Sequence, residues 1–237
     1  KVKDPSGAEY LVEAKFILDA SGFGRVLPRL LHLESPSGFP VRASIFTHVE
    51  DRIAACEFDR NKILIAVHPA HRDVWYWLIP FTRGRASVGV VAESKFLSVV
   101  PATSLAASLQ ACVSAEPRFS RLLRNAHWDT PVRQLTGYAA NVKSLHGRGF
   151  ALLGNAGEFL DPVFSSGVTI AFKSASLAVE LLERKLAGQA VDWQNEFALP
   201  LKAGIDTFRA FVESWYRGAF QRIIFHANPP REVRRMI

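Results

Sequence analysis

One segment, residues 153–168, constrains the fold of this 237-residue chain more than any other. It reads Leu-Gly-Asn-Ala-Gly-Glu-Phe-Leu-Asp-Pro-Val-Phe-Ser-Ser-Gly-Val, and it joins the apolar run 150–153 to a helix-length apolar pattern over 168–186. Its glycines, its Asp-Pro step and its Ser-Ser-Gly start predict a strand, a tight loop and a helix in succession. The first amides of a helix attract anions, so we predict a ligand loop for a phosphate, a ring edge or a halide.

Two further segments carry distinctive patterns. Residues 75–80 read Trp-Tyr-Trp-Leu-Ile-Pro, and alternate residues of a strand share a face, so Trp75 and Trp77 should stand side by side. Paired aromatic residues on a strand are also common core material. Residues 16–22 read Phe-Ile-Leu-Asp-Ala-Ser-Gly, an apolar strand that ends in Asp19 and a glycine turn.

Together these segments resemble the flavin-dependent halogenases, tryptophan-halogenase-like FAD-dependent oxidoreductases with the aromatic-hydroxylase-type fold. Their Trp-x-Trp-x-Ile-Pro signature is matched at every fixed position of residues 75–80. The ligand loop resembles the third FAD-contacting motif of that family, with Asn155, Gly157 and Glu158 in place of Asp, Ala and Gly. The strand that ends at Asp19 is similar to one found across glutathione-reductase-type flavoproteins.

The resemblance implies roles for named residues. The expected FAD contacts are Asp19, Gly22, Gly154, Asn155, Asp161, Pro162, Ser165, Gly167 and Val168. The amides of Ser166 and Gly167 would hold a halide, and Trp75 and Trp77 would act as gatekeepers between flavin and substrate. An ordinary capped helix start, and an Asp19 that only caps its own turn, are the structural alternatives. The family's catalytic lysine lies in its N-terminal part, and no lysine here matches it.

The resemblance also implies an α/β (α+β) architecture in three parts. Residues 1–33 and 148–188 would form a partial FAD-binding layer of the glutathione-reductase type. Residues 40–147 would form an inserted antiparallel substrate-side sheet with covering helices, and residues 190–237 a C-terminal helical subdomain. No strand is followed by Gly-x-Gly-x-x-Gly, so we expect the chain to lack the N-terminal nucleotide-binding segment of a longer flavoprotein.

Local patterns predict the elements. An opening hairpin would pair residues 1–3 with a return strand over 8–18. The sheet strands are expected at 43–49, 53–58, 62–68, 74–81 and 86–92. A helix should begin behind Thr103 or Ser104 and end before Pro117, with a second helix after it. An apolar stripe from Leu201 to Ile223 predicts a helical tail.

Composition narrows the class of protein. The chain is 49% hydrophobic and has no run of about 18 apolar residues, so we expect a globular protein without a membrane span. Two cysteines make no disulfide framework, and the histidines show no ligand spacing, so we expect no metal and a cytoplasmic location. The charge of +7 is spread out, which argues against nucleic acid. Its one dense cluster, Arg231, Arg234 and Arg235, is read as a solvated face, with peripheral contact to a membrane or an acidic carrier as the alternative.

The predicted function is that of the C-terminal part of an FAD-dependent halogenase. The resemblance implies reduced FAD from a partner flavin reductase, oxygen, a halide and an aromatic substrate, either free or tethered to an acyl or peptidyl carrier protein. A flavin monooxygenase or a geranylgeranyl-reductase-like oxidoreductase is one alternative, although Trp75 and Trp77 argue against it. A non-catalytic, flavoprotein-derived binding module is the other.

Overall fold

The computed structural model describes residues 1–100 and 103–226, and these form two compact units. Unit 1 comprises Lys1–Ser37 and Ala139–Val212, and unit 2 comprises Gly38–Tyr138 and the chain from Glu213 onward. Each unit is therefore built from two separate segments of the chain. The predicted division into three parts stays a prediction, and the arginine cluster at 231–235 lies outside the described residues.

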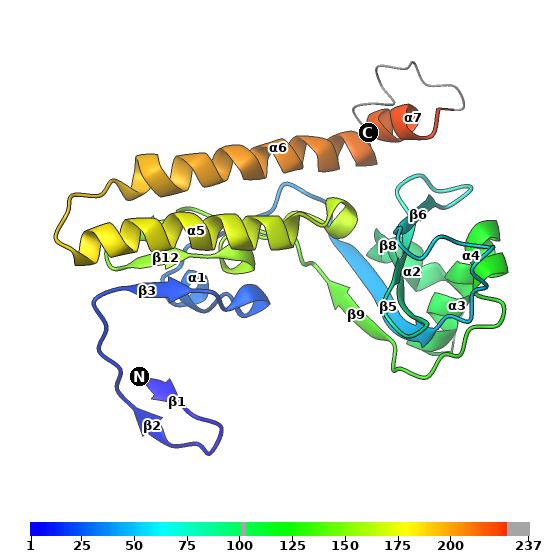
Figure 1. Ribbon diagram of the computed structural model, residues 1–237, viewed down its shortest axis with the longest axis horizontal. Coiled ribbons are helices and arrows are strands. Elements are labelled where there is room, and N and C mark those ends of the chain that lie inside the picture. The colour runs from blue at the N-terminus through cyan, green and yellow to red at the C-terminus, as the bar shows by residue number, and fades with distance from the viewer. Residues whose placement is uncertain (101–102, 227–237) are drawn as a thin grey trace. The chain divides into compact units, whose positions relative to one another are not determined.

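Unit 1 is a mixed layer of short strands and long helices (Figure 1). In chain order its elements are β1 (Val2–Lys3), β2 (Glu9–Tyr10), β3 (Ile17–Asp19), η1 (Gly22–Gly24), α1 (Val26–Leu30), β4 (Glu34–Ser35), β10 (Asn141–Val142), β11 (His146–Gly147), β12 (Phe150–Leu152), η2 (Gly154–Ala156), η3 (Pro162–Phe164), α5 (Ser166–Leu186), η4 (Gln194–Ala198) and most of α6 (Leu199–Tyr216).

The centre of unit 1 is a three-stranded sheet in the order β11-β12-β3. Strands β3 and β12 run parallel, with Leu152 aligned on Asp19, so both strands end at the same edge. The loop after β12 leads into α5, which returns over the sheet and buries Ile170, Ala178 and Leu181. Ligands commonly bind where the carboxyl ends of parallel strands meet.

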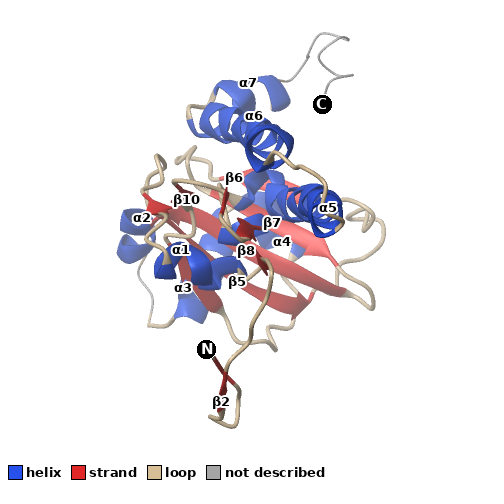
Figure 2. Cartoon of the chain, turned by 90° about the vertical axis from the view of Figure 1, so that its left-hand side faces the viewer, coloured by secondary structure: helices blue, strands red, loops and turns tan. Residues whose placement is uncertain are grey.

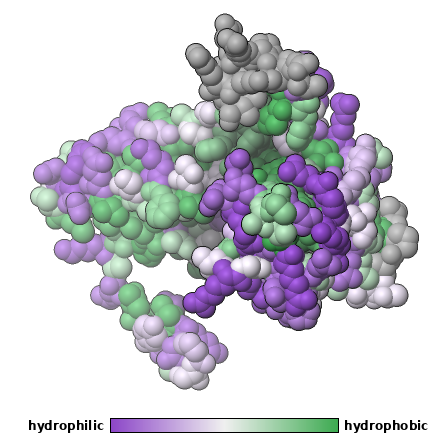
Figure 3. All heavy atoms as spheres, turned by 45° about the vertical axis from the view of Figure 1, so that its right-hand side comes forward, coloured by the Kyte–Doolittle hydropathy of each residue, from purple (hydrophilic) through white to green (hydrophobic). Residues whose placement is uncertain are grey.

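The N-terminal hairpin contributes little to the core of unit 1. Strands β1 and β2 pair antiparallel, and all four of their residues are exposed. The chain that follows exposes Leu11 and Val12, and an apolar patch lies beside the hairpin in the space-filling view (Figure 3). The predicted return strand over 8–18 is wrong in extent: it is broken between β2 and β3, since this stretch is solvent-exposed and has no second strand to pair with.

Unit 2 is built on an antiparallel sheet (Figure 2). Its elements are β5 (Arg42–Glu50), β6 (Leu64–Val67), β7 (Trp75–Pro80), β8 (Arg85–Glu93), α2 (Ser94–Val99), α3 (Leu105–Ala115), α4 (Pro117–Leu122), β9 (Arg133–Thr136) and α7 (Ala219–Ile224). The strand order is β6-β7-β8-β5-β9. The chain is thus a mixed α/β protein, as predicted.

The core of unit 2 lies between one face of this sheet and helices α3 and α4. Tyr76 and Leu78 point to this face from β7 and are fully buried. Leu109 and Phe119 meet them from the two helices and are also fully buried. Alternation along β7 therefore sends Trp75 and Trp77 to the opposite face, because neighbouring side chains of a strand point to opposite sides.

Most local predictions for unit 2 are confirmed. Ser104 caps α3, its side chain accepting from the Ala107 amide at 3.2 Å, and α4 begins at Pro117. The strand expected at 53–58 is wrong, because that segment turns. The Asp51 carboxylate accepts the Ile53 amide at 3.1 Å, and such a side chain-to-backbone bond favours a turn over a strand.

The predicted helical tail is confirmed, but it is not continuous. Helix α6 ends at Tyr216, and Gly218 adopts a left-handed φ of 76° before α7 begins. The predicted stripe is buried at Leu201 and Trp215, but Ile223 beyond the break is 45% exposed.

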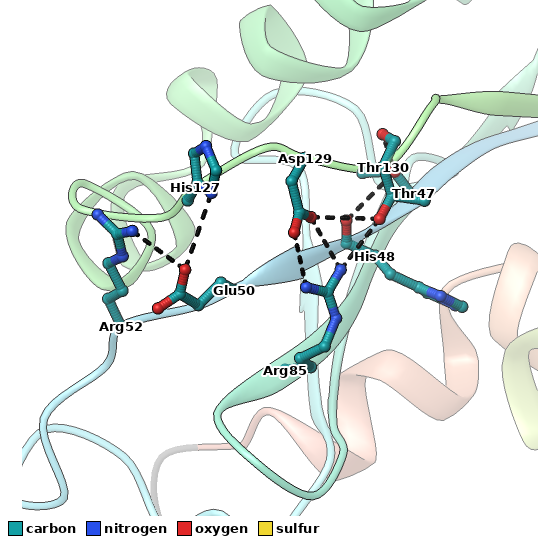
Figure 4. Close-up of polar contacts among 8 residues, drawn as sticks. All are labelled: Thr47, His48, Glu50, Arg52, Arg85, His127, Asp129 and Thr130. Carbon is teal, nitrogen blue, oxygen red and sulfur yellow. Dashed lines mark hydrogen bonds and ion pairs between the residues drawn. The ribbon is translucent and has the colours of Figure 1, made fainter.

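A bidentate ion pair fixes the segment that enters β9 (Figure 4). Arg85 donates to the two carboxylate oxygens of Asp129 at 2.7 and 2.8 Å, and also to the Thr130 hydroxyl at 3.0 Å. Thr47 on β5 donates its hydroxyl to the Thr130 carbonyl at 2.8 Å. The Arg85 guanidinium holds the pKa of Asp129 well below its usual range. These contacts join β8, β5 and the start of β9 at one end of the sheet.

Candidate functional site

The predicted ligand loop is built at the carboxyl ends of two parallel strands. The Leu153 amide donates to the Asp19 carbonyl at 2.8 Å, which extends the β3–β12 pairing to the last residue before the loop. The loop contains η2 and η3 and runs into α5. The structure thus brings the segments that contain Asp19 and Gly154 side by side.

The Asp19 carboxylate binds backbone amides of the turn that follows it. Its carboxylate oxygens accept the amides of Ser21 and Leu27, each at 2.8 Å, and the side chain is buried. Gly22, with a φ of 59°, opens η1 in this turn, where a left-handed backbone favours glycine. The capping alternative for Asp19 is therefore present in the structure, and any contact of Asp19 or Gly22 with a cofactor stays a prediction.

Gly154 lets the loop lie against α5. Its φ is 50°, and a Cβ at this position would lie 3.0 Å from the Cβ and 3.3 Å from the Cα of Ala171. Its amide donates to the Ser174 hydroxyl at 2.9 Å, and Ser174 is fully buried. A side chain at residue 154 would push the helix away from the strand, so this glycine is required by close packing.

Asp161 and Pro162 shape the second half of the loop. Asp161 is 3% exposed, and its carboxylate accepts the Val163 amide at 3.0 Å. Pro162 is the first residue of η3, where its fixed φ suits a helical turn. Ser165 then takes a left-handed φ of 51°, which is uncommon for a residue other than glycine. The chain therefore turns sharply immediately before α5.

The start of α5 lacks a side-chain cap and contains a buried hydroxyl without a hydrogen-bond partner within the described residues. Ser165 occupies the N-cap position but makes no side-chain cap bond to the helix. Ser166 is 1% exposed, and its buried Oγ has no hydrogen-bond partner within the described residues. A buried hydroxyl without a partner is costly, so a ligand that accepts from it is favoured here.

Asn155 and Gly167 lie close together at this helix start. A Cβ on Gly167 would lie 3.6 Å from the Asn155 Oδ1 and 3.1 Å from the Phe159 ring. Thus the residue that replaces the family's aspartate faces the first turn of α5. Val168 is 65% exposed on the same turn, so it is open to a ligand but contributes little to the core.

Sequence reasoning missed Arg25. The residue is 5% exposed, and its guanidinium binds the Glu34 carboxylate at 3.0 Å. It also donates to the backbone carbonyls of Asn155, Gly157 and Asn141 at 3.2, 3.0 and 2.9 Å. The only local signal is an arginine that directly follows a Gly-Phe-Gly turn, because the three carbonyls come from a distant part of the chain.

Glu158 has a structural role in the ligand loop. It is 3% exposed and accepts from Lys202 Nζ at 2.6 Å and from Arg209 at 3.1 Å. Both cations are on α6, so the glutamate that replaces a family glycine ties this helix to the ligand loop. Buried carboxylates usually need such partners.

The two tryptophans of unit 2 lie side by side, as predicted, with ring centroids 5.8 Å apart. Trp75 is buried and donates its Nε1–H to the Tyr216 hydroxyl at 2.9 Å. Trp77 is half-buried and donates to the Ser87 hydroxyl on β8 at 3.0 Å. Both indole nitrogens are therefore satisfied, which fixes the ring orientations.

Gly89 on β8 makes room for the Trp77 ring. A Cβ on Gly89 would lie 2.7 Å from the Trp77 Cε2 and closer still to Cζ2 and Cη2. Gly89 is aligned with Trp77 across the β7–β8 pair. The ring therefore lies flat over a backbone position that tolerates no side chain, which the sequence motif does not reveal.

No group of three or more metal-ligating side chains occurs within residues 1–100 and 103–226. Among the helices of this same part of the chain, none has the length and apolar character needed to cross a bilayer. Cys56 and Cys112 are both free thiols, one exposed and one buried.

The chain is similar to halogenases and to other flavoproteins. It is 29% identical over 170 residues to the 1H-pyrrole-2-carbonyl-[peptidyl-carrier protein] chlorinase of Pseudomonas fluorescens, which covers 70% of this chain and 38% of that protein. It is 34% identical over 196 residues to the tryptophan 2-halogenase of Chondromyces crocatus, which covers 79% of this chain and 36% of that enzyme. The chain thus spans less than half the length of these relatives.

A solved structure shares the fold of this chain. The flavoprotein/dehydrogenase of Cytophaga hutchinsonii superimposes with a TM-score of 0.90 at 39% sequence identity, over 96% of this chain and 55% of that one. The profile of the tryptophan halogenase family matches residues 2–222. Since this match extends over nearly the whole sequence, the chain belongs to the tryptophan halogenase family.

Proposed function

We propose that the protein containing this chain is an FAD-dependent halogenase that acts on an aromatic substrate. The observation that carries the proposal is the start of α5, where an uncapped helix end coincides with the buried, unpartnered hydroxyl of Ser166. The positive end of a helix dipole and free first-turn amides favour a small anion. Ser166 and Gly167 are the proposed halide ligands.

The residues of the ligand loop fit a flavin. The proposed contacts are those implied by the resemblance: Asp19, Gly22, Gly154, Asn155, Asp161, Pro162, Ser165, Gly167 and Val168. The left-handed Ser165 just before α5 and the 65% exposed Val168 support this assignment, because they leave the sharp turn into the helix open to a ligand. When bound, FAD supplies the redox chemistry. The chain's own contribution is to bind the cofactor and to place an anion at a helix start.

Trp75 and Trp77 are proposed as gatekeepers. They carry no acid or base, and their indole nitrogens are engaged with Tyr216 and Ser87. Rigid rings of this kind can exclude an organic substrate and water from a reactive cofactor. The relatives' names support this class of chemistry, because one halogenates tryptophan and another a pyrrole held on a peptidyl carrier protein.

The remaining partners follow from the same proposal. Reduced FAD would come from a flavin reductase, and the substrate would be an aromatic compound, either free or held on a carrier protein. A cytoplasmic location is part of the proposal. The catalytic lysine of the family would have to come from a part of the protein outside this chain.

The test is a halide titration of the intact protein. Purified protein should be yellow, and with a flavin reductase it should form a halogenated product that mass spectrometry detects only when chloride or bromide is present. Ser166→Ala should raise the halide KM about tenfold, since one hydrogen bond to a charged group contributes roughly 1.5 kcal/mol. FAD affinity should stay nearly constant.

Thr169→Val is the matched control, because Thr169 is an exposed hydroxyl residue in the same turn of α5. Equal halide KM values for Ser166→Ala and Thr169→Val would refute the halide site. A product that gains oxygen but no halogen would favour the monooxygenase alternative, and absence of any flavin in the intact protein would favour the binding module.

A further inference from the structure

Arg42 is a buried cation without an acidic partner. It is the first residue of β5 and is 5% exposed. Its guanidinium carbon lies 3.4 Å from the centroid of the Tyr216 ring, and its Nε is buried without a hydrogen-bond acceptor. Within the described residues it forms no ion pair. Burying a charge is unfavourable, and a cation–π contact offsets only part of that cost.

The acid aligned with Arg42 on the neighbouring strand is engaged elsewhere. Glu93 is aligned with Arg42 across the β5–β8 pair. Its carboxylate binds Lys95 Nζ at 2.9 Å, and its side chain is 25% exposed. A glutamate opposite a buried arginine would ordinarily form the pair. Here Glu93 pairs with a surface lysine instead, so it does not neutralise the Arg42 guanidinium.

Arg42 belongs to the tryptophan face of the sheet. Alternate residues of β5 share a face, so Arg42 and Phe46 point to the same side. Phe46 lies 6.1 Å from Trp77, measured between ring centroids. Tyr216 contacts Arg42 with its ring and Trp75 with its hydroxyl. A guanidinium therefore borders a continuous aromatic surface.

A ligand that suits this surface combines a flat ring with an oxyanion. A guanidinium presents paired N–H donors that match a carboxylate, and aromatic walls suit a planar ring. We propose that Arg42 binds the carboxylate of an aromatic acid, which is the substrate of the site. The inference deepens the proposed function and rests on it for the aromatic nature of the substrate. The proposed contact of Arg42 with a carboxylate favours a free acid over its neutral amide or thioester.

The test compares benzoate with benzamide by isothermal titration calorimetry of the intact protein, without reduced flavin, oxygen turnover or halide. Wild-type protein should bind benzoate at least tenfold more tightly than benzamide. Arg42→Gln should weaken benzoate binding at least tenfold and leave benzamide unchanged. Arg42→Lys should fall between them, because an ammonium keeps the charge but loses the paired donors.

Arg133→Gln is the control, since Arg133 is an exposed arginine on β9 that is aligned with Phe46. It should leave benzoate binding unchanged. Thermal unfolding of each variant checks the fold, and benzoate should raise the Tm of wild-type protein more than that of Arg42→Lys. If Arg42→Gln does not fold, benzoate binding by Arg42→Lys is compared with benzoate binding by Arg133→Gln. Weaker binding by Arg42→Lys alone supports the inference, and equal binding overturns it.

Several results would overturn the inference. Equal binding of benzoate and benzamide would show that the carboxylate is not recognised. Tighter binding of inorganic phosphate than of benzoate would assign Arg42 to a phosphate-bearing ligand. Loss of FAD affinity in Arg42→Gln with unchanged benzoate binding would assign it to the cofactor. A protein that binds benzoate through Arg42 but halogenates nothing would refute the proposed function alone.

Discussion

Substitution of Gly89 by alanine tests how the Trp77 ring is held. The added methyl group would lie within 2.7 Å of the Trp77 Cε2, which real carbon contacts do not tolerate, so the ring must move. Overpacking of this kind costs about 1–3 kcal/mol. Movement also breaks the Trp77–Ser87 hydrogen bond, worth about 1 kcal/mol. Alanine restores roughly 0.5–1 kcal/mol by reducing the freedom of the unfolded chain.

The net expected loss is therefore about 2 kcal/mol in the free energy of unfolding. For a chain of this size this corresponds to a fall in Tm of about 4–8 °C. In a Trp77→Leu background the ring atoms that clash are gone. There Gly89→Ala should be neutral or slightly stabilising, so the sign of its effect should reverse.

The assay is a double-mutant cycle of the four proteins by urea unfolding. The matched control is Gly38→Ala, because a Cβ on Gly38 meets no atom within 4 Å. Gly89→Ala effects that are equal in the two backgrounds would refute the packing argument. So would a loss below about 0.5 kcal/mol in the presence of Trp77, since that is the scale of an ordinary surface substitution.

Three other predictions follow from the geometry. Glu158→Gln leaves Lys202 and Arg209 without their buried partner and should lower the free energy of unfolding by about 2 kcal/mol. This loss is smaller than that for a fully buried pair, because both cations are partly exposed. Glu183→Gln is the exposed control and should cost little, and equal losses for the two variants would contradict the role of Glu158 in holding α6. Burial lowers the pKa of His68 in the folded protein, and the Ala70 amide donates to its Nδ1 at 3.1 Å. The unfolded chain therefore binds a proton more readily, and the free energy of unfolding should fall as pH drops through about 6.5. His68→Phe should flatten this pH dependence, and an unchanged slope would show that His68 does not cause it. Asn155→Asp should lower the FAD Kd about fivefold in a fluorescence titration, since a charged acceptor strengthens the bond by roughly 1 kcal/mol. An unchanged Kd would place Asn155 away from the cofactor.

The local features of the candidate site could be predicted from the sequence because their causes are local. The Asp161–Val163 cap and the Ser104 cap each join residues two or three positions apart. The alternation that puts Trp75 and Trp77 on one face depends only on strand geometry. The wrongly predicted strand at 53–58 shows the limit, since Asp51 redirects the backbone there by a side-chain bond.

The sequence by itself determined the succession of strand, loop and helix at residues 153–168 and the pairing of the two tryptophans, because periodicity and turn chemistry act over a few residues. Only the tertiary structure decided which side chains hold these parts in place. Arg25 reaches a carbonyl 132 residues away, and Trp75 binds a hydroxyl 141 residues away. Such contacts depend on the packing of distant segments, and no local pattern encodes which acceptor or which glycine will lie opposite a given side chain.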